Sequence, residues 1–193
     1  MEKEYNFALK LLKITREELQ FKMILQHDDN ESNDECIGQD KECIYTDGAC
    51  PNNGRGANHA GIGVFFGDND PRNISSLFML DNPTNNRAEL AAILMALENS
   101  SKDNIEICSD SQYSISCITK WMSKWKSNGW KTANGKPVKN KDLIVNIDKE
   151  LSKKRFISFR YVPNNDHKIP KDKRNKDHYG NYMADKLANE GIQ

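Results

Sequence analysis

Four acidic residues stand where a carboxylate is structurally awkward. Asp47 and Asp110 each end a short apolar stretch that predicts a strand, and Glu89 and Asp185 lie on the apolar faces of two predicted helices. Carboxylates in such places are costly unless they are paired with a base or bound to a cation, and no obvious basic partner accompanies them within their motifs. Singly, each acid is typical of a cap, a turn or a salt bridge. Together, the four can converge at the carboxyl edge of one sheet, where open α/β folds carry their sites.

Such a cluster of like charges requires a divalent metal. Ligation by oxygen alone favours Mg²⁺, with Mn²⁺ as the alternative. Two such ions, about 3.5–4 Å apart, can activate a water and stabilise the leaving oxygen of a phosphodiester. The four acids therefore predict metal-dependent phosphodiester chemistry.

The elements that must position these acids follow from hydrophobic periodicity and turn residues. The predicted strands cover residues 43–46, 60–66, 74–80, 105–109 and 156–162. The predicted helices cover 87–98, 110–118, 141–151 and 181–189, with a further lysine- and tryptophan-rich helix and loop before residue 141. This order predicts an α/β fold with a mixed five-stranded sheet, in which three antiparallel meander strands precede two parallel strands and helices cover the faces.

The net charge of zero hides a segregation along the chain. Lys+Arg and Asp+Glu both total 28 in the 193 residues, but residues 1–46 carry a net charge of −5 and the rest carry +5. Seven lysines and no acid lie between Lys120 and Lys141. A neutral total therefore does not exclude a nucleic-acid partner.

Other protein classes are excluded more directly. No apolar run approaches the ~20 residues that span a bilayer, and the first residues lack the basic and apolar regions of a signal peptide. The five cysteines include no C-x-x-C pair, which disfavours a zinc knuckle or a disulfide framework. We therefore expect an intracellular protein, in the cytoplasm or nucleus and not secreted, that contacts no membrane and is a monomer.

Residues 1–42 form a separate N-terminal region in our interpretation. Apolar residues at roughly helical spacing predict an amphipathic helix over the first 26 residues, and the acidic stretch 27–42 is typical of a linker. The helix can pack on its own domain or dock on a protein partner. Residues 43–193 are expected to form the catalytic domain.

The basic stretch combines aromatic and cationic side chains. Three tryptophans and the lysines between them favour a surface that grips nucleic acid, because lysines neutralise phosphates and aromatic faces pack on sugar and base. A tryptophan packed into the core is the alternative for any one of the three. The predicted substrate-binding residues here are Trp121, Lys124, Trp125, Lys126, Trp130 and Lys131.

Four short motifs occur together in order. They are YTDGAC at 45–50, TNNRAELAA at 84–92, SDSQY at 109–113 and ADKLA at 184–188. With them the chain strongly resembles ribonuclease H type 1 over about residues 43–191. The resemblance implies a ribonuclease H-like fold and hydrolysis of the RNA strand of an RNA–DNA hybrid, leaving 5′-phosphate and 3′-hydroxyl ends.

The resemblance also implies roles for individual residues. Asp47, Glu89, Asp110 and Asp185 would ligate the metals. Asn85, Asn86 and Gln112 would reach the minor groove of the hybrid, where the 2′-hydroxyl distinguishes RNA from DNA. Thr84 and Asn140 resemble residues that seat a phosphate of the DNA strand, although caps and turns also favour these residue types.

One departure from the family concerns a loop histidine. Family members carry it about ten residues before the last acid, whereas here His167 precedes Asp185 by eighteen residues and His178 by seven. His167 is the preferred counterpart because it follows the last predicted strand closely. His178 and the absence of any catalytic histidine remain alternatives.

Two rival functions retain the same fold. A non-catalytic module could bind the hybrid without cutting it, but it would gain nothing from buried like charges. A transposase- or resolvase-type enzyme would cut DNA, but it would not need the Trp/Lys stretch together with the Asn/Gln set.

Overall fold

The computed structural model describes residues 41–51, 59–79, 83–164 and 175–193. Contacts group these residues into one unit that covers residues 40–193. The predicted helix in residues 1–26, most of the acidic linker and His167 lie outside the described residues. None of the helices in the described ranges is both long enough and apolar enough to cross a bilayer.

Five strands form one mixed sheet in the order β3-β2-β1-β4-β5. Their bounds are β1 Glu42–Ala49, β2 Ala60–Phe65, β3 Ile74–Phe78, β4 Asn104–Ser109 and β5 Phe156–Tyr161. The first three strands pair antiparallel, whereas β4 pairs parallel with both β1 and β5. The predicted fold class and strand pattern are thereby confirmed.

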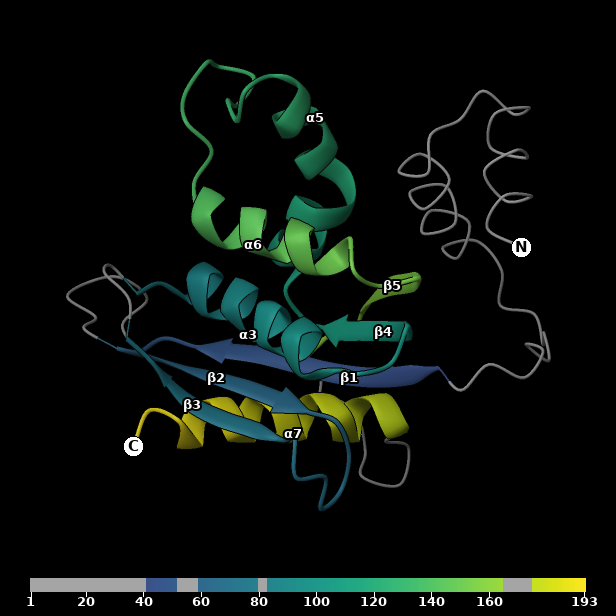
Figure 1. Ribbon diagram of the computed structural model, residues 1–193. Coiled ribbons are helices and arrows are strands. Elements are labelled where there is room, and N and C mark those ends of the chain that lie inside the picture. Colours follow the sequence, from purple (N-terminus) through teal and green to yellow (C-terminus); the bar gives the residue numbers. More distant parts are fainter. Residues whose placement is uncertain (1–40, 52–58, 80–82, 165–174) are drawn as a thin grey trace, which may run out of the picture. The chain divides into compact units, whose positions relative to one another are not determined.

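Helices cover both faces of this sheet, as Figure 1 shows. Their bounds are α3 Asn85–Asn99, α4 Gln112–Ser116, the π-helix η1 Cys117–Trp121, α5 Met122–Ser127, α6 Lys141–Leu151 and α7 Lys176–Glu190. α3 packs on one face and α7 on the other, while α6 lies over α3 and α5 is farther from the sheet. The main core lies between the sheet and α3, α4, η1 and α6.

The end of the first strand and the start of the last helix differ most from the sequence-based expectation. Asp47 was expected to end the first strand, but β1 continues to Ala49 because its pairing with β2 extends beyond its pairing with β4. α7 begins at Lys176 rather than at Asn181, since the Asn175 side chain accepts hydrogen bonds from the backbone N–H groups of the first turn. The expected polar loop is therefore shorter at its C-terminal end.

Glycines bring both flanking helices unusually close to the sheet. A Cβ at Gly48 would overlap the backbone of α3 at Ala88 and Glu89. A Cβ at Gly63 would overlap the backbone of α7 at Ala184. Gly48 follows Asp47 and meets the backbone of Glu89, while Gly63 pairs with Asp47 and meets the residue before Asp185. The two glycines therefore set how closely the backbones that carry these acids can approach.

Candidate active site

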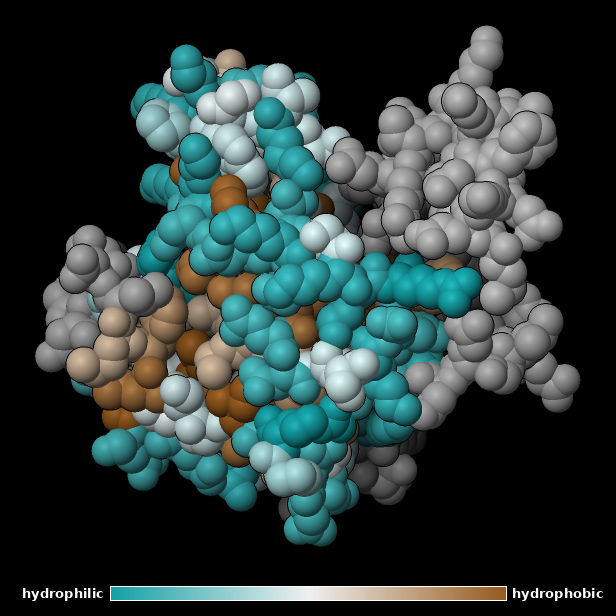
Figure 2. Space-filling model, viewed as in Figure 1, coloured by the Kyte–Doolittle hydropathy of each residue, from teal (hydrophilic) through white to brown (hydrophobic). Residues whose placement is uncertain are grey.

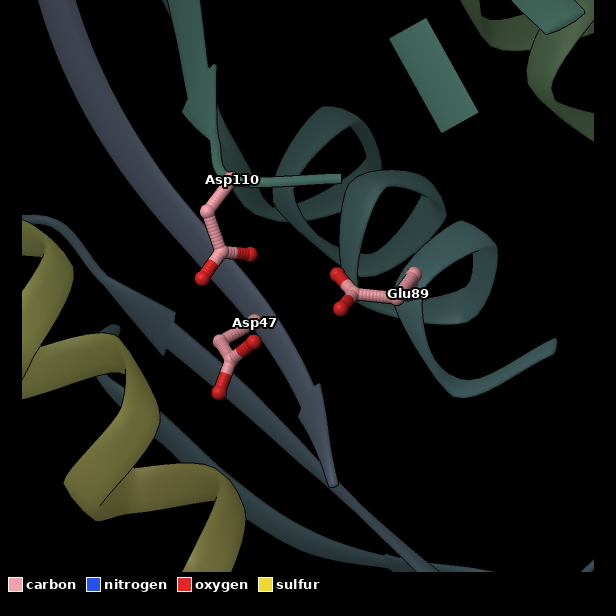
Figure 3. Close-up of side chains that lie close together, drawn as sticks. All are labelled: Asp47, Glu89 and Asp110. Atoms are coloured by element: carbon pink, nitrogen blue, oxygen red, sulfur yellow. The ribbon is translucent and has the colours of Figure 1, made fainter. Parts of the chain in front are cut away.

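Three of the four predicted acids converge at the edge of the sheet where β4 ends. Asp47 comes from β1, Glu89 from α3, and Asp110 follows directly after β4. One carboxylate oxygen from each lies within 4.8 Å of the others. Figure 3 shows the three side chains pointing toward one another. Asp47 and Glu89 are buried, with 7% and 4% of their surface exposed.

Asp185 lies on α7 and lines the same cleft, although it is not part of that group of three. The cleft has a volume of about 740 Å³. Its walls include all four predicted acids and two of the predicted amides, Asn85 and Gln112. The fold therefore gathers the four acids in one cleft open to solvent.

Burial and mutual repulsion make these carboxyl groups hard to ionise. Burial, reinforced by the charges of Asp110 and Asp185, raises the pKa of Asp47 to about 7. Burial, followed by the charge of Asp47, raises the pKa of Glu89 well above its usual value. The pKa of Asp110 is also raised, first by burial. Within the described part of the chain, no lysine or arginine forms an ion pair with any of the four acids.

This arrangement fits a divalent cation. Glu89 Oε2 is buried and has no hydrogen-bond partner among the described residues, so its lone pairs are available to a ligand. A cation at the group would offset the repulsion that keeps the carboxyl groups protonated. Oxygen donors of this kind suit Mg²⁺ or Mn²⁺.

Two further residues of the site were missed by the sequence analysis. The side chains of Asn164 and Asn181 lie close to Asp110 and oppose the rise of its pKa. Asn181 is 4% exposed, and its Oδ1 has no hydrogen-bond partner in the described structure. The spacing of four residues between Asn181 and Asp185 on one helix was a usable signal. No local signal marks Asn164.

The predicted substrate-binding amides lie around the cleft at helix starts. Asn85 and Gln112 line it, and Asn85 Nδ2 lies 3.5 Å from Glu89 Oε1. Asn86 is exposed on α3 but does not line the cleft. Asn140 precedes α6 with a left-handed backbone, and its amide donates to Tyr113 Oη at 3.1 Å.

Thr84 caps α3, where its hydroxyl accepts from the backbone N–H of Arg87. Arg87 in turn forms a two-pronged ion pair with Asp142, in the first turn of α6. Because Asp142 follows Asn140 by two residues, this pair ties the start of α3 to the start of α6. The two residues of the predicted phosphate pocket are thus held by one structural link.

The three tryptophans are placed unequally. Trp121 is 41% exposed, whereas Trp125 and Trp130 are partly buried and pack against the main core. Trp121 and Trp125 remain neighbours, with ring centroids 5.7 Å apart. The predicted lysines of this stretch, Lys124, Lys126 and Lys131, are all exposed. Figure 2 shows hydrophilic residues over much of the surface formed by α5 and α6.

The alternative histidine has a structural task. His178 lies in the first turn of α7, where its Nδ1 accepts from the backbone N–H of Asn175 and completes a capping box. It does not line the cleft. The preferred candidate, His167, stays a prediction because it lies outside the described residues.

Comparisons with known proteins agree with this geometry. The profile of the RNase H family matches residues 39–193. The chain is 45% identical over 168 residues to Ribonuclease H of Schizosaccharomyces pombe, covering 87% of this chain and 58% of that protein. It is 38% identical to Ribonuclease H1 of Homo sapiens, covering 78% of this chain and 49% of that protein. The chain therefore spans about half the length of these two relatives.

For shorter relatives and for a solved structure, the match covers most of the other protein's length. Ribonuclease H of Actinobacillus pleuropneumoniae is 39% identical, over 77% of this chain and 88% of that protein. The solution structure of the PFV RNase H domain superposes with a TM-score of 0.61 and 28% identity. It covers 80% of this chain and 96% of that chain. The match thus extends through the whole sheet and all the acids of the cleft.

Proposed function

Because this chain belongs to the RNase H family, we propose that it is an endonuclease that hydrolyses the RNA strand of RNA–DNA hybrids. The observation that carries the proposal is the cluster of Asp47, Glu89 and Asp110, whose carboxylate oxygens lie within 4.8 Å of one another without a basic partner in the described structure. A module that only binds a hybrid has no use for buried acids that repel one another. The names of the relatives, Ribonuclease H and H1, support the same activity.

The carboxylates of Asp47, Glu89, Asp110 and Asp185 would hold two divalent cations, Mg²⁺ or in its place Mn²⁺. Such cations supply activation of an attacking water and neutralisation of charge on the leaving 3′-oxygen, which gives 5′-phosphate and 3′-hydroxyl ends. Asn181 and Asn164 lie close to Asp110 and favour its ionised form, which is the form that ligates a cation. Burial of Asp47 and Glu89 excludes water from one side of the cluster and strengthens its attraction for cations.

Residues around the cleft would hold the hybrid. Asn85 and Gln112 lie where amides can read the 2′-hydroxyl in the minor groove, and the exposed lysines of residues 120–141 would neutralise phosphates. Trp121 offers an exposed aromatic face, whereas Trp125 and Trp130 support it from the core. Such contacts read shape and backbone, so we expect little sequence preference.

The cellular setting belongs to the same proposal. An intracellular location, cytoplasmic or nuclear, is supported by the four cysteines of the described residues, which are all free thiols. A monomer and a docking role for the N-terminal region stay predictions.

The test is cleavage by the full chain of three labelled duplexes of one sequence: RNA–DNA hybrid, RNA–RNA and DNA–DNA. We expect cuts only in the RNA strand of the hybrid, with either Mg²⁺ or Mn²⁺. Asp110→Asn should abolish cleavage and leave hybrid binding largely intact. Asp103→Asn, at the opposite end of β4 and exposed, is the matched control and should cleave normally. Cutting of duplex DNA, or full activity of Asp110→Asn, would overturn the proposal.

A further inference from the structure

A second group of polar and charged side chains lies between the sheet and the first turn of α7 and has no part in the chemistry proposed above. Arg160 on β5 donates from Nε to Glu106 Oε2 at 2.9 Å and from Nη1 to Asp177 Oδ2. Tyr45 on β1 donates to Asp177 Oδ1 at 2.8 Å. We call Tyr45, Glu106, Arg160 and Asp177 the clasp. It joins three strands of the sheet to the first turn of α7.

The spacing along α7 connects the clasp with the cleft. Asp177, Asn181 and Asp185 follow one another at intervals of four residues, which places them on one face of the helix. The first is held by the clasp, the second is buried and lies close to Asp110, and the third lines the cleft. One face of α7 thus meets the sheet at three successive polar points.

Because of how α7 packs on the sheet, the position of its first turn sets the positions of Asn181 and Asp185. From Asp177 to Asp185 the helix rises about 12 Å, over which an α-helix is stiff. Gly180 lies directly against the ring of Tyr45, and Gly63 lies against the backbone at Ala184, so the helix has little lateral freedom once its start is fixed. Metal ligands must be placed to within about 0.2 Å. A small shift of the first turn would therefore disturb both Asn181 and Asp185.

We propose that Arg160 and Asp177 are positioning residues for the acidic cleft: their ion pair fixes the first turn of α7 and thereby sets the places of Asn181 and Asp185. The inference rests on the proposed function, since it assumes that the four acids bind divalent cations. Neither residue touches the reacting atoms. Their effect is on cation affinity, carried through the helix.

The experiment measures Mn²⁺ binding to the metal-free full chain by isothermal titration calorimetry, without substrate. Asp177→Asn removes the charge that faces Arg160 and keeps an oxygen that can accept from Tyr45. Arg160→Met removes the other partner and retains much of its apolar stem. We expect each variant to bind Mn²⁺ about 3–10-fold more weakly, since partners beyond the ligands typically change metal affinity by about 10–100-fold and these act one step further away. The losses of affinity in the double variant should be less than additive, because both changes break the ion pair between Arg160 and Asp177.

Asp70→Asn is the matched control. It breaks an ion pair with Arg72 at 2.6 Å whose arginine side chain is 34% exposed, against 35% for Arg160. It lies in the turn between β2 and β3, away from the cleft, and should bind Mn²⁺ as the wild type does. Asp110→Asn gives the baseline for a damaged cluster.

Three results would count against the inference. Wild-type affinity in both Asp177→Asn and Arg160→Met would overturn it and leave the proposed function standing. An equal loss in Asp70→Asn would also overturn it, because the effect would then follow from general destabilisation. If Asp110→Asn bound Mn²⁺ as tightly as the wild type, the proposed metal site would fail, and the inference with it.

Discussion

Glu106 on β4 and Asp110 just after it belong to two different groups of acids, and the pKa values of their carboxyl groups shift in opposite directions. Glu106 is buried, which favours its neutral form, yet its pKa is lowered because Lys41 and Arg160 each approach it at 2.9 Å. Asp110, four residues later, lies with Asp47 and Glu89, and the pKa values of all three are raised. The first group is paired with cationic side chains, whereas the second has no such partner among the described residues. The difference teaches that the fold can pair a buried acid when stability requires it, and that the cleft is left for a cation from outside.

The largest expected effect is on catalysis. Glu89→Gln should lower the rate of hybrid cleavage by about 10³-fold or more, because it removes an anionic oxygen from the cluster. Glu106→Gln, measured at saturating Mg²⁺, should stay within about threefold of the wild type, since its carboxylate only holds other protein groups. The measurement is the single-turnover rate on a labelled hybrid. Similar losses in the two variants would remove the distinction between the groups.

The order of the two variants should be reversed for stability: Glu106→Gln should lower the free energy of unfolding more than Glu89→Gln does. Glu106→Gln leaves Arg160 and Lys41 without their shared carboxylate and should lower the free energy of unfolding by about 2–4 kcal/mol. Glu89→Gln relieves repulsion in the metal-free protein and should leave that energy unchanged or raise it by about 1 kcal/mol. Denaturant unfolding in the presence of a chelator measures both. A marked destabilisation by Glu89→Gln would show that its charge is satisfied within the fold.

The pH dependence of stability gives a third contrast. Asp47 has a pKa of about 7 in the folded chain, against 3.8 as the ordinary value, so the folded state holds the proton more tightly. Protonation of Asp47 therefore stabilises the fold fully below pH 3.8, and this stabilisation is lost as the pH rises through about 7. Asp47→Asn should therefore be more stable than the metal-free wild type by about 1–3 kcal/mol near pH 8, with a smaller difference near pH 5. Unfolding curves at several pH values measure it, and a pH-independent difference would contradict the account.

The smallest effect on stability is expected at Lys41, the more exposed of the two cationic partners of Glu106. Lys41 contacts Glu106 at 2.9 Å, but its side chain is 40% exposed. Lys41→Met should lower the free energy of unfolding by about 0.5–1 kcal/mol, since solvent screens such pairs. Thermal unfolding at low salt measures this. Lys153→Met, which breaks the pair between Lys153 and Glu150, is the control for the loss of a more exposed lysine. A loss comparable to that of Glu106→Gln would mean that Lys41 rather than Arg160 balances the buried acid.

Much of the fold and of the cleft followed from the sequence, because strand periodicity and short motifs are local signals. The order of strands, the cap at Thr84 and the convergence of Asp47, Glu89 and Asp110 were predictable in this way. Contacts between distant segments were not. The closeness of Asn164 to Asp110 depends on where β5 ends relative to β4, which no local pattern encodes.

The early start of α7 and the unequal tryptophans show the same limit. The cap at Asn175 is completed by a histidine, which is not part of the usual capping-box signature. A π-helix over Cys117–Trp121 changes the helical register just before Trp125, so spacing alone could not tell which tryptophan faces solvent. Arg160 and Asp177 are far apart in the predicted elements, and only the packing of α7 on the sheet brings them together.

The central claim is that the acids of the cleft, which have no cationic partner among residues 41–51, 59–79, 83–164 and 175–193, bind divalent ions. The most direct measurement is the free energy of unfolding at about pH 8, with and without Mg²⁺, for the wild type and Glu89→Gln. A ligand that binds only the folded state stabilises it, by about 2.7 kcal/mol at a hundredfold excess over its dissociation constant. The account predicts a clear gain for the wild type and little or none for Glu89→Gln. Equal gains in the two proteins, or no gain in the wild type, would contradict it.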